Sequence, residues 1–446
     1  MMEDKIQQNL ANFIVNCRYE SIEPRLITDM KYRVIDWLGC AIAGADYPQA
    51  IIGRQLFADI GGKQDAVIIG ASGKYPAACA AMVNGIIGHV SELDDGHRKA
   101  IGHPGSVTLP VALALGEKLN ITGKEFLQAL AIGYDLFIRL GQTVNPSHYA
   151  YWHTTGTCGA FAATATAASI MKLTAEQTNN ALGIVATLSG GLTVSFGSHA
   201  KALNIGHACQ NGIYAACLAE GGFTGAPDAI TGKKGFIAAT STQDNHDSLI
   251  HCGETGLLSD TAFYKVYASC GHTNSPLDAT FNLLNSHRPD PNNIVKIEVE
   301  TYRIAVSLTG EFKADNEDQA KFSLPYCMAV AILFGKVSLQ QFKPDVLSDP
   351  AVRALAKKIV VTESSQATQR FPKRQASVTI TLNNGQKYTD SVSDSCDIAD
   401  YDLIEKKFFD AAQAIDLNAS ESVIYYIKTM DQYAGITPLI NYLRLM

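Results

Sequence analysis

The sequence predicts a mainly α protein, built from a large all-helical domain and a smaller α+β domain. The 446 residues are 47% hydrophobic and only 18% charged, whereas a soluble domain usually carries about 25% charged residues. The chain can therefore bury a large core. Helical signals dominate the first 265 residues, and from Ile294 the hydrophobic pattern changes to a period of two residues, which is typical of half-buried strands.

Two helix starts carry the same local pattern. The segments Thr122–Glu125 and Thr174–Gln177 both fit the capping box, in which a hydroxyl and a side-chain acceptor three residues later each bind a backbone amide at the helix start. An apolar run follows each segment. Residues 159–170 contain six alanines, and such small side chains let neighbouring helices approach closely.

Charge is unevenly distributed along the chain. Between Gly141 and Ala200 the only formally charged residues are Lys172 and Glu176, so we expect this stretch to be deeply buried. A membrane span would need roughly 20 consecutive, mainly apolar residues. The uncharged segment Gln177–Ala200 begins with four polar residues and contains a Gly-Gly pair and a histidine. It would be a poor span, and we expect no contact with a membrane.

The second domain is predicted from two strand patterns. Val295, Ile297 and Val299 alternate with charged residues, and a second alternating run leads into Asn384-Gly385, which supplies the positive φ of a tight hairpin. The helical pattern then returns near the C-terminus. We expect residues 1–265, completed by residues 402–446, to form the large helical domain and residues 266–401 to form the small α+β domain.

Composition and motifs exclude several classes of protein. Ten cysteines are present without a Cys-x-x-Cys pair, so zinc-ribbon, thioredoxin-like and iron–sulfur sites lack their spacing. The net charge is −7 and no Lys/Arg run exceeds two residues, so nucleic acid is not an expected partner. The sequence contains no dinucleotide-binding Gly-x-Gly-x-x-Gly motif, no Walker A motif and no Gly-x-Ser-x-Gly nucleophile elbow. The first eight residues do not resemble an export signal. We expect a cytoplasmic protein whose acid–base chemistry needs no cofactor.

The densest group of acids and bases lies in a predicted loop between a helix that ends near His89 and one that follows Pro104. Seven of the eleven histidines lie between His89 and His207, and imidazole is well suited to proton transfer near neutral pH. A solvated charged loop is one alternative. A metal site is another, but the ligand types present match no recognised spacing, so no metal is expected. Those ligand types are Glu92, Asp94, His97 and His103.

Further candidates lie downstream. His153 is either a proton carrier or a structural histidine beside aromatic residues, and the Gly156–Gly159 turn after it could present free amides to an anion. Lys201 follows 24 uncharged residues, so its ammonium either reaches water or is held inside to neutralise an anion, with His199 as its companion. The last cluster is Lys265, Tyr267 and His272, with a surface lysine beside a core tyrosine as the structural alternative.

Six segments, in this order, resemble motifs of the MmgE/PrpD family along nearly the whole chain. The first is His89–Asp95, which is similar to the family's His-Ala-x-Asp-Phe-Asp-Asp element. The others are Gly102–Ser106, Trp152–Thr157, Lys201–Gly206, Lys265–Cys270 and Phe322–Tyr326. The sequence departs from the family pattern at Glu92, where Asp is usual, and at Asn204 and Asn274, where His is common.

The resemblance implies a large all-α domain with a smaller α+β domain, a homodimer, and a site without a cofactor. By position, the proposed catalytic residues are His103, His153, Lys201 and Lys265. The proposed substrate-binding residues are Glu92, Asp94, Asp95, Arg98, Tyr267 and His272.

Three functions remain open at this point. The first is a lyase that abstracts the α-proton of a small di- or tricarboxylate and eliminates a β-leaving group, as a dehydratase does; a base near the C–H bond and cations near the enolate serve this chemistry. The second is an epimerase of a succinyl-type amino, imino or thio dicarboxylate, which uses the same carbanion. The third is a non-catalytic binding protein that retains the fold.

Overall fold

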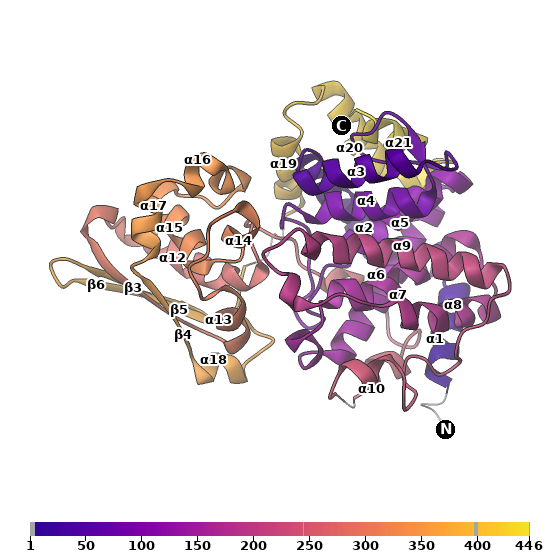
Figure 1. The fold of residues 1–446 in the computed structure, drawn as a ribbon, viewed down its shortest axis with the longest axis horizontal. Helices are drawn as coiled ribbons and strands as arrows, with labels where there is room; N and C mark the ends of the chain where they lie inside the picture. The colour runs from indigo at the N-terminus through magenta and orange to yellow at the C-terminus, as the bar shows by residue number, and fades with distance from the viewer. Residues whose placement is uncertain (1–4, 244, 397–399, 446) are drawn as a thin grey trace. The chain divides into compact units, whose positions relative to one another are not determined.

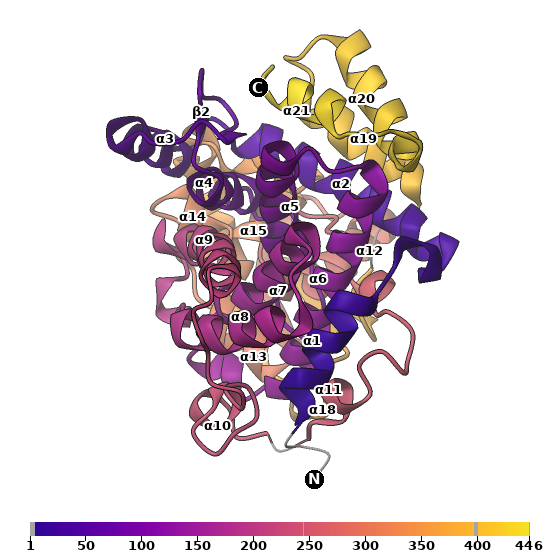
Figure 2. The ribbon, with the colours of Figure 1, turned by 90° about the vertical axis from the view of Figure 1, so that its right-hand side faces the viewer.

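The computed structural model describes residues 5–243, 245–396 and 400–445. They form two compact units, whose elements are labelled in Figure 1 and seen from a second side in Figure 2. The helical unit holds the described residues of 1–195, 200–264 and 399–446, and the α+β unit holds those of 196–199 and 265–398. The predicted fold class, mainly α with a large helical part and a smaller α+β part, is confirmed.

The predicted domain boundaries, at residues 265/266 and 401/402, stay predictions about independently folding parts of the chain. The compact units divide close by, at 264/265 and 398/399.

Among the described residues of the helical unit, the helices are α1 (Ile6–Asn16), α2 (Pro24–Gly44), α3 (Pro48–Ile60), α4 (Ala77–His89), α5 (Gly105–Leu119), α6 (Gly123–Val144), α7 (Thr154–Met171), α8 (Ala175–Leu188), α9 (Ala200–Glu220), α10 (Phe236–Thr240), α11 (Asp247–Ile250), α19 (Tyr401–Ala411), α20 (Leu417–Thr429) and α21 (Thr437–Leu443). A short hairpin of β1 (Ala66–Val67) and β2 (Lys74–Tyr75) accompanies them.

Helix α7 forms the core of the helical unit. It packs against α5, α6, α8 and α9, and every residue from Thr154 to Ala168 is buried. The predicted burial of the charge-poor stretch is therefore confirmed for α7. It is wrong for residues 186–200, which are half-buried or exposed because they include the connection from α8 to α9. In the described ranges, no helix combines the length and apolar character needed to cross a membrane.

Local sequence signals start two of these helices as predicted. The Thr122 hydroxyl accepts from the Glu125 amide at 3.2 Å, and the Glu125 carboxylate accepts from the Thr122 amide at 2.8 Å. Thr174 and Gln177 form the same reciprocal pair. These capping boxes satisfy amides that have no partner inside the helix, and they begin α6 and α8.

The C-terminal helices return to the helical unit, as the sequence predicted. Helices α19 and α20 pack against α2, and α21 packs against α5; they are the yellow helices in Figure 2. Lys407 of α19 donates to Asp36 of α2 at 2.7 Å and to the main-chain carbonyl of Leu93 at 2.6 Å. The end of the chain thus supports a loop some 300 residues earlier.

The α+β unit contains a four-stranded sheet in the order β4-β3-β5-β6. Strands β3 and β4 are parallel, and the other two pairs are antiparallel. Helix α12 packs against β5 and β6. The described elements are α12 (Asn274–His287), β3 (Ile294–Thr301), α13 (Arg303–Thr309), α14 (Glu317–Ala320), α15 (Leu324–Phe334), α16 (Pro344–Leu347), α17 (Pro350–Ala356), β4 (Ile359–Glu363), α18 (Ser365–Gln369), β5 (Ala376–Leu382) and β6 (Lys387–Val392).

The predicted hairpin is confirmed, and one predicted strand face needs a correction. Strands β5 and β6 join through a turn in which Gly385 has φ +83°. In β3, Ile297 and Val299 are buried as predicted, but Val295 is 50% exposed and Ile294 is buried instead. The pairing of β3 with β5 shifts register between Ile294 and Lys296, and such an irregularity reverses the alternation at that end of the strand.

Replacing Gly212 by alanine tests the close approach of α9 to α7. The new Cβ would lie 2.4 Å from the Cβ of Ala163, so the two helices would have to separate. We expect Gly212→Ala to lower the free energy of unfolding by about 1–3 kcal/mol, measured by urea denaturation. Gly221→Ala is the control, because its Cβ would meet no neighbour closer than 3.5 Å. An equal effect of both substitutions would contradict the packing.

Candidate active site

The loop between α4 and α5, residues 90–104, carries most of the candidate site. Helix α4 ends at His89 and α5 begins at Gly105, as the sequence predicted. Glu92 and Ile101 turn the chain with φ values of +56° and +50°. A solvated charged loop is wrong for this segment, because its acids and one of its histidines are buried. These buried residues are Glu92, Asp94, Asp95 and His97.

The carboxylate of Asp94 holds the centre of this cluster. Its Oδ2 accepts hydrogen bonds from His89 Nδ1 at 2.8 Å and from Ser106 Oγ at 2.6 Å. The Nδ1 atom of His103 lies 3.2 Å from the same oxygen. Asp94 is only 1% exposed, so three polar side chains replace the water that an ionised carboxylate would otherwise bind.

Lys201, at the start of α9, is held inside the unit. Its ammonium donates to the Glu92 carboxylate and to His89 Nε2, the latter at 2.6 Å. Lys201 is 6% exposed, so of the two alternatives the structure agrees with an ammonium held inside, where its partner is the buried carboxylate of Glu92. His199 belongs to the α+β unit, where its Nε2 lies 3.6 Å from the Asp318 carboxylate.

Hydrogen bonds define the tautomer of His103. Its Nδ1 lies 2.6 Å from the main-chain carbonyl of Asp95, and a carbonyl oxygen can only accept. Nδ1 therefore carries a proton, and in the neutral ring Nε2 carries the lone pair. His103 is also partly exposed, whereas His89 and His153 are buried. This is the arrangement that a general base needs.

His153 lies immediately before α7 and is buried with 2% exposure. Burial lowers the pKa of His153 well below its usual value, and the positive charge of Lys201 acts in the same direction. Its ring centroid lies 6.2 Å from that of His89, and the rings of His89 and His103 are 4.9 Å apart. The structure therefore brings three imidazoles and one ammonium together, with His153 neutral.

The predicted anion-binding turn at Gly156–Gly159 is wrong. Helix α7 already begins at Thr154. The amides of Gly156 and Thr157 donate to the His153 carbonyl at 2.8 and 3.1 Å, so they are used by the first helical turn.

Asp95 is placed by a second, deeper network. Its Oδ2 accepts from the Tyr134 hydroxyl at 2.8 Å and lies 3.4 Å from Arg33 Nη1, while its Oδ1 accepts from the Gly105 amide at 3.1 Å. Burial raises the pKa of Asp95 to about 7, although the Arg33 guanidinium opposes this shift. These contacts give Asp95 a structural role at the start of α5, and its predicted contact with substrate stays a prediction.

Two other residues of the loop differ in their surroundings. His97 uses both ring nitrogens, because Nδ1 accepts from the Ala100 amide at 2.9 Å and Nε2 lies 3.0 Å from the Thr261 hydroxyl. It is therefore not available as the metal ligand considered above. Arg98 is half-buried, and its guanidinium lies 5.1 Å from the ring centroid of Phe263.

The remaining predicted residues belong to the α+β unit. Lys265 is buried. The Tyr267 hydroxyl donates to Asp278 at 2.8 Å, and His272 Nδ1 lies 2.7 Å from the Tyr302 hydroxyl. The predicted site residues thus divide between the units, with seven gathered around the 90–104 loop or beside it and three in the α+β unit.

Sequence reasoning assigned no role to several residues that build the cluster. His89 begins the first family motif and the densest group of acids and bases, and its spacing to Glu92 and Asp94 at the end of a helix is a signal that could have given it a role. Arg33 and Lys407 gave no such signal, because they reach the loop from 62 and 314 residues away. Only the folded chain brings their charges to it.

One group of ligand-type side chains lies close enough to hold a metal, as far as the described residues extend. It consists of His89, Asp94 and His103, whose ligand atoms lie within 4.8 Å of one another. The hydrogen bonds to Asp94 account for this proximity. A cation there would have to displace the Nδ1 protons of both histidines.

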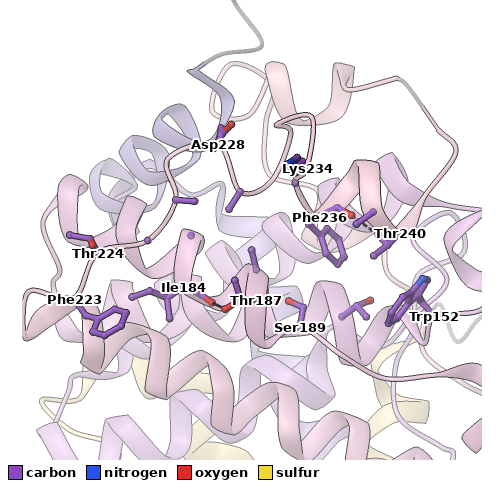
Figure 3. A pocket seen from close by; sticks show the side chains of 18 residues that line it. Trp152, Ile184, Thr187, Ser189, Phe223, Thr224, Asp228, Lys234, Phe236 and Thr240 are labelled. Carbon is purple, nitrogen blue, oxygen red and sulfur yellow. Dashed lines mark hydrogen bonds between the residues drawn. The ribbon is translucent and has the colours of Figure 1, made fainter.

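A separate cavity of about 470 Å³ opens beside α8 and α10. Figure 3 shows its aromatic walls, Trp152, Phe223 and Phe236, with Lys234 nearby. It reaches the start of α7 through Trp152 and Thr157, and none of the predicted site residues lines it. The histidine cluster and this cavity are therefore distinct features of the helical unit.

Fold and cluster together define a class: a mainly helical protein in two parts, with an acid–base centre of histidines, carboxylates and a lysine. The chain belongs to the MmgE/PrpD family. The model of the MmgE/PrpD N-terminal domain matches residues 8–248, and the model of the C-terminal domain matches residues 267–423. The resemblance expected from the six motifs is confirmed.

Curated relatives match the chain along its length. Cis-aconitate decarboxylase of Aspergillus terreus is 25% identical over 468 residues, covering 98% of this chain and 96% of the relative. The Homo sapiens protein of the same name is 24% identical over 470 residues, covering 100% and 95%. The cis-aconitate decarboxylase-like protein oryM of Aspergillus oryzae is 24% identical over 469 residues, covering 98% and 97%. The family thus includes lyases named for a small tricarboxylate.

Breaking the buried ion pair of Lys201 and Glu92 is expected to destabilise the fold. Lys201→Met leaves a buried carboxylate without its cation, which costs about 3–5 kcal/mol. The double variant Lys201→Met/Glu92→Gln should lose less than the sum of the two single variants. Urea unfolding of all four proteins measures the coupling. Additivity to within about 0.5 kcal/mol would contradict the pairing.

Asp95 is expected to make stability depend on pH. Its pKa is about 7 in the folded chain and about 3.9 when unfolded, so the folded state holds the extra proton between these values. The contribution of Asp95 to the free energy of unfolding is therefore fully present below pH ~4 and is lost as pH rises to about 7.

Asp95→Asn removes the titrating carboxyl group. The free energy of unfolding of this variant, relative to that of the parent, should therefore rise between pH 5 and pH 8. Urea midpoints at each pH measure the difference. Asp59→Asn, at the surface of α3, is the control. A difference that stays constant over this pH range would contradict the raised pKa.

Proposed function

We propose that this protein is a cofactor-independent lyase that removes the α-proton of a small di- or tricarboxylate and eliminates a β-leaving group. The observation that supports this most is the tautomer of His103. The Asp95 carbonyl holds its Nδ1 proton, so Nε2 has the lone pair of a base, and the buried charges of Asp94 and Lys201 lie in the same cluster.

The chemical step balances with side chains of this chain alone. His103 Nε2 takes the α-proton, and the electron pair of the C–H bond forms the new C=C bond. The bond to the β-leaving group breaks, and a second group protonates the departing oxygen. A low-dielectric surrounding strengthens the attraction between the ammonium of Lys201 and the enolate-like charge that develops.

The other predicted residues enter this proposal by position. We propose His153 and Lys265 as further catalytic groups, in line with the family motifs. Arg98 would hold a substrate carboxylate with its guanidinium, which can bind two oxygens at once. We propose Glu92, Asp94, Asp95, Tyr267 and His272 as residues that shape or line the substrate site. A second copy of the chain is the proposed partner, in a homodimer.

Cis-aconitate is the first substrate to test, because the relatives are named for its decarboxylation. In that reaction the C–C bond to a carboxylate breaks, CO2 leaves, and the carbanion takes a proton from the enzyme. Hydroxy, amino and thio derivatives of succinate and of tricarballylate form the rest of the panel.

An epimerase is the second candidate, and the same cluster supports it. Inversion needs two proton-transfer groups with different protonation, and His103 and His153 differ in their surroundings. Incubation in D2O separates the reactions. Deuterium in recovered, inverted substrate without a new double bond would indicate epimerisation, whereas an absorbing double bond or released CO2 would indicate a lyase.

We expect His103→Ala to lower kcat by roughly 100-fold or more, the usual effect of losing a general base, under conditions in which urea denaturation shows the variant to be folded. Product formation by the parent and the variant on the active substrate measures this. His251→Ala is the control, because the His251 side chain is exposed and pairs with Glu254. If the parent converts no member of the panel above background but binds one of them, the protein is a binding protein and the lyase proposal is wrong.

A further inference from the structure

We infer that Asn204 is a positioning residue that fixes His153 as the tautomer protonated on Nε2, and so makes His153 the hydrogen-bond donor to the leaving oxygen that complements the base His103. The role as donor rests on the proposed function. The tautomer itself stands on contacts within the helical unit and is tested separately. Asn204 is one of the positions where this sequence departs from the family motif.

The orientation of the Asn204 amide follows from its neighbour Ser195. The Ser195 hydroxyl donates its single proton to the Leu192 carbonyl at 2.7 Å, because a carbonyl can only accept. Towards Asn204, Ser195 Oγ is then an acceptor, and it lies 3.0 Å from Nδ2. Only the NH2 group of an amide can donate to it, so the two ends of the Asn204 side chain are distinguished by the hydrogen-bond network rather than chosen arbitrarily.

The second proton of the same NH2 group determines His153. Asn204 Nδ2 lies 3.2 Å from His153 Nδ1. Since Nδ2 is a donor, Nδ1 accepts, and the proton of the neutral imidazole is on Nε2. An amide does not titrate in the range where enzymes work, so this preference does not change with pH.

The surroundings keep His153 neutral. It is buried, and it is faced by Lys201 from α9, by His89 from α4, and by Glu92 and His103 from the 90–104 loop. Burial and the charge of Lys201 oppose a second proton on the ring, whereas Glu92 favours it. A neutral ring with Nε2–H can donate a hydrogen bond to an oxygen on which negative charge develops, while it keeps its own proton.

His103 and His153 therefore have opposite tautomers. The Asp95 carbonyl accepts from His103 Nδ1, whereas Asn204 donates to His153 Nδ1. In the elimination, His103 Nε2 gains the α-proton, the second group protonates the leaving oxygen, and water departs. His153 keeps its proton and donates a hydrogen bond from Nε2–H to that oxygen. His103 then holds one proton more than at the start and the second group one fewer, so one proton must pass through solvent before the next turnover.

Asn204→Asp reverses the hydrogen bond with almost no change in shape. A carboxylate only accepts, so it would draw the His153 proton to Nδ1 and leave the lone pair of the neutral ring on Nε2. Asn204→Ala removes the donor without adding charge and serves as the second variant. Gln210→Glu makes the same neutral-to-acidic change elsewhere on α9 and is the matched control.

The first readout is independent of activity. Long-range 1H–15N NMR of histidine-labelled protein, with His153 assigned by loss of its signals in His153→Gln, reports which ring nitrogen carries the proton. We expect Nε2–H in the parent and in Gln210→Glu, and Nδ1–H with an unprotonated Nε2 in Asn204→Asp. A parent His153 protonated on Nδ1 would overturn the inference, whatever the substrate proves to be.

The second readout separates the two proton transfers. In D2O, exchange of the substrate α-hydrogen reports the base, and product formation reports the whole elimination. We expect Asn204→Asp to retain exchange within about threefold while kcat for product falls roughly 100-fold, the usual effect of losing one hydrogen-bond donor to a developing negative charge. We expect His103→Ala to lose both. Equal loss of exchange and product in Asn204→Asp, or unchanged product formation, would overturn the donor role.

The two failures are distinguishable. If no polycarboxylate undergoes exchange or conversion, the proposed function fails and the donor role fails with it, while the NMR result still decides the tautomer. If conversion is found and the NMR spectra show Nδ1–H in the parent, the function stands and the role of Asn204 is wrong. Near-ultraviolet circular dichroism of each variant checks that the cluster remains folded.

Discussion

The carboxylate of Asp94 accepts hydrogen bonds from His89 and Ser106 and lies beside His103 Nδ1, and much of the site depends on this one buried charge. It joins the last residue of α4 to the first turn of α5, so the loop between them has little freedom. It also directs the Nδ1 proton of His89, which leaves His89 Nε2 to accept from Lys201. One anion thereby orders a chain of donors and acceptors that ends at α9.

Close helix packing makes such a network possible in a dry interior. Gly85 of α4 and Gly206 of α9 face each other so closely that a Cβ at Gly85 would lie 3.3 Å from the Gly206 Cα. The side chains of these helices therefore meet at short range. A charge buried in the helical unit needs a partner. The fold supplies partners of opposite charge: Glu92 for Lys201, Asp95 for Arg33, and Asp36 for Lys407.

Predictions from sequence succeeded where the signal is local. A capping box involves residues three apart, and a hairpin turn needs positive φ at one position, so Thr122, Thr174 and Gly385 were assigned correctly. Predictions failed where the outcome depends on strand pairing or on neighbouring elements. The register shift in β3 leaves Val295 exposed. Helix α7 begins at Thr154, two residues before the predicted glycine turn, with His153 as its N-cap residue.

The sequence by itself determined the fold class, the family and the kinds of side chain present in the site, because helix periodicity, caps and motif order are properties of neighbouring residues. Only the tertiary structure decided what each of those side chains does. The tautomer of an imidazole depends on whether its neighbour donates or accepts, and those neighbours come from other elements: Asn204 reaches His153 across 51 residues, and Lys201 reaches Glu92 across 109. Protonation is thus a property of contacts that no local pattern encodes.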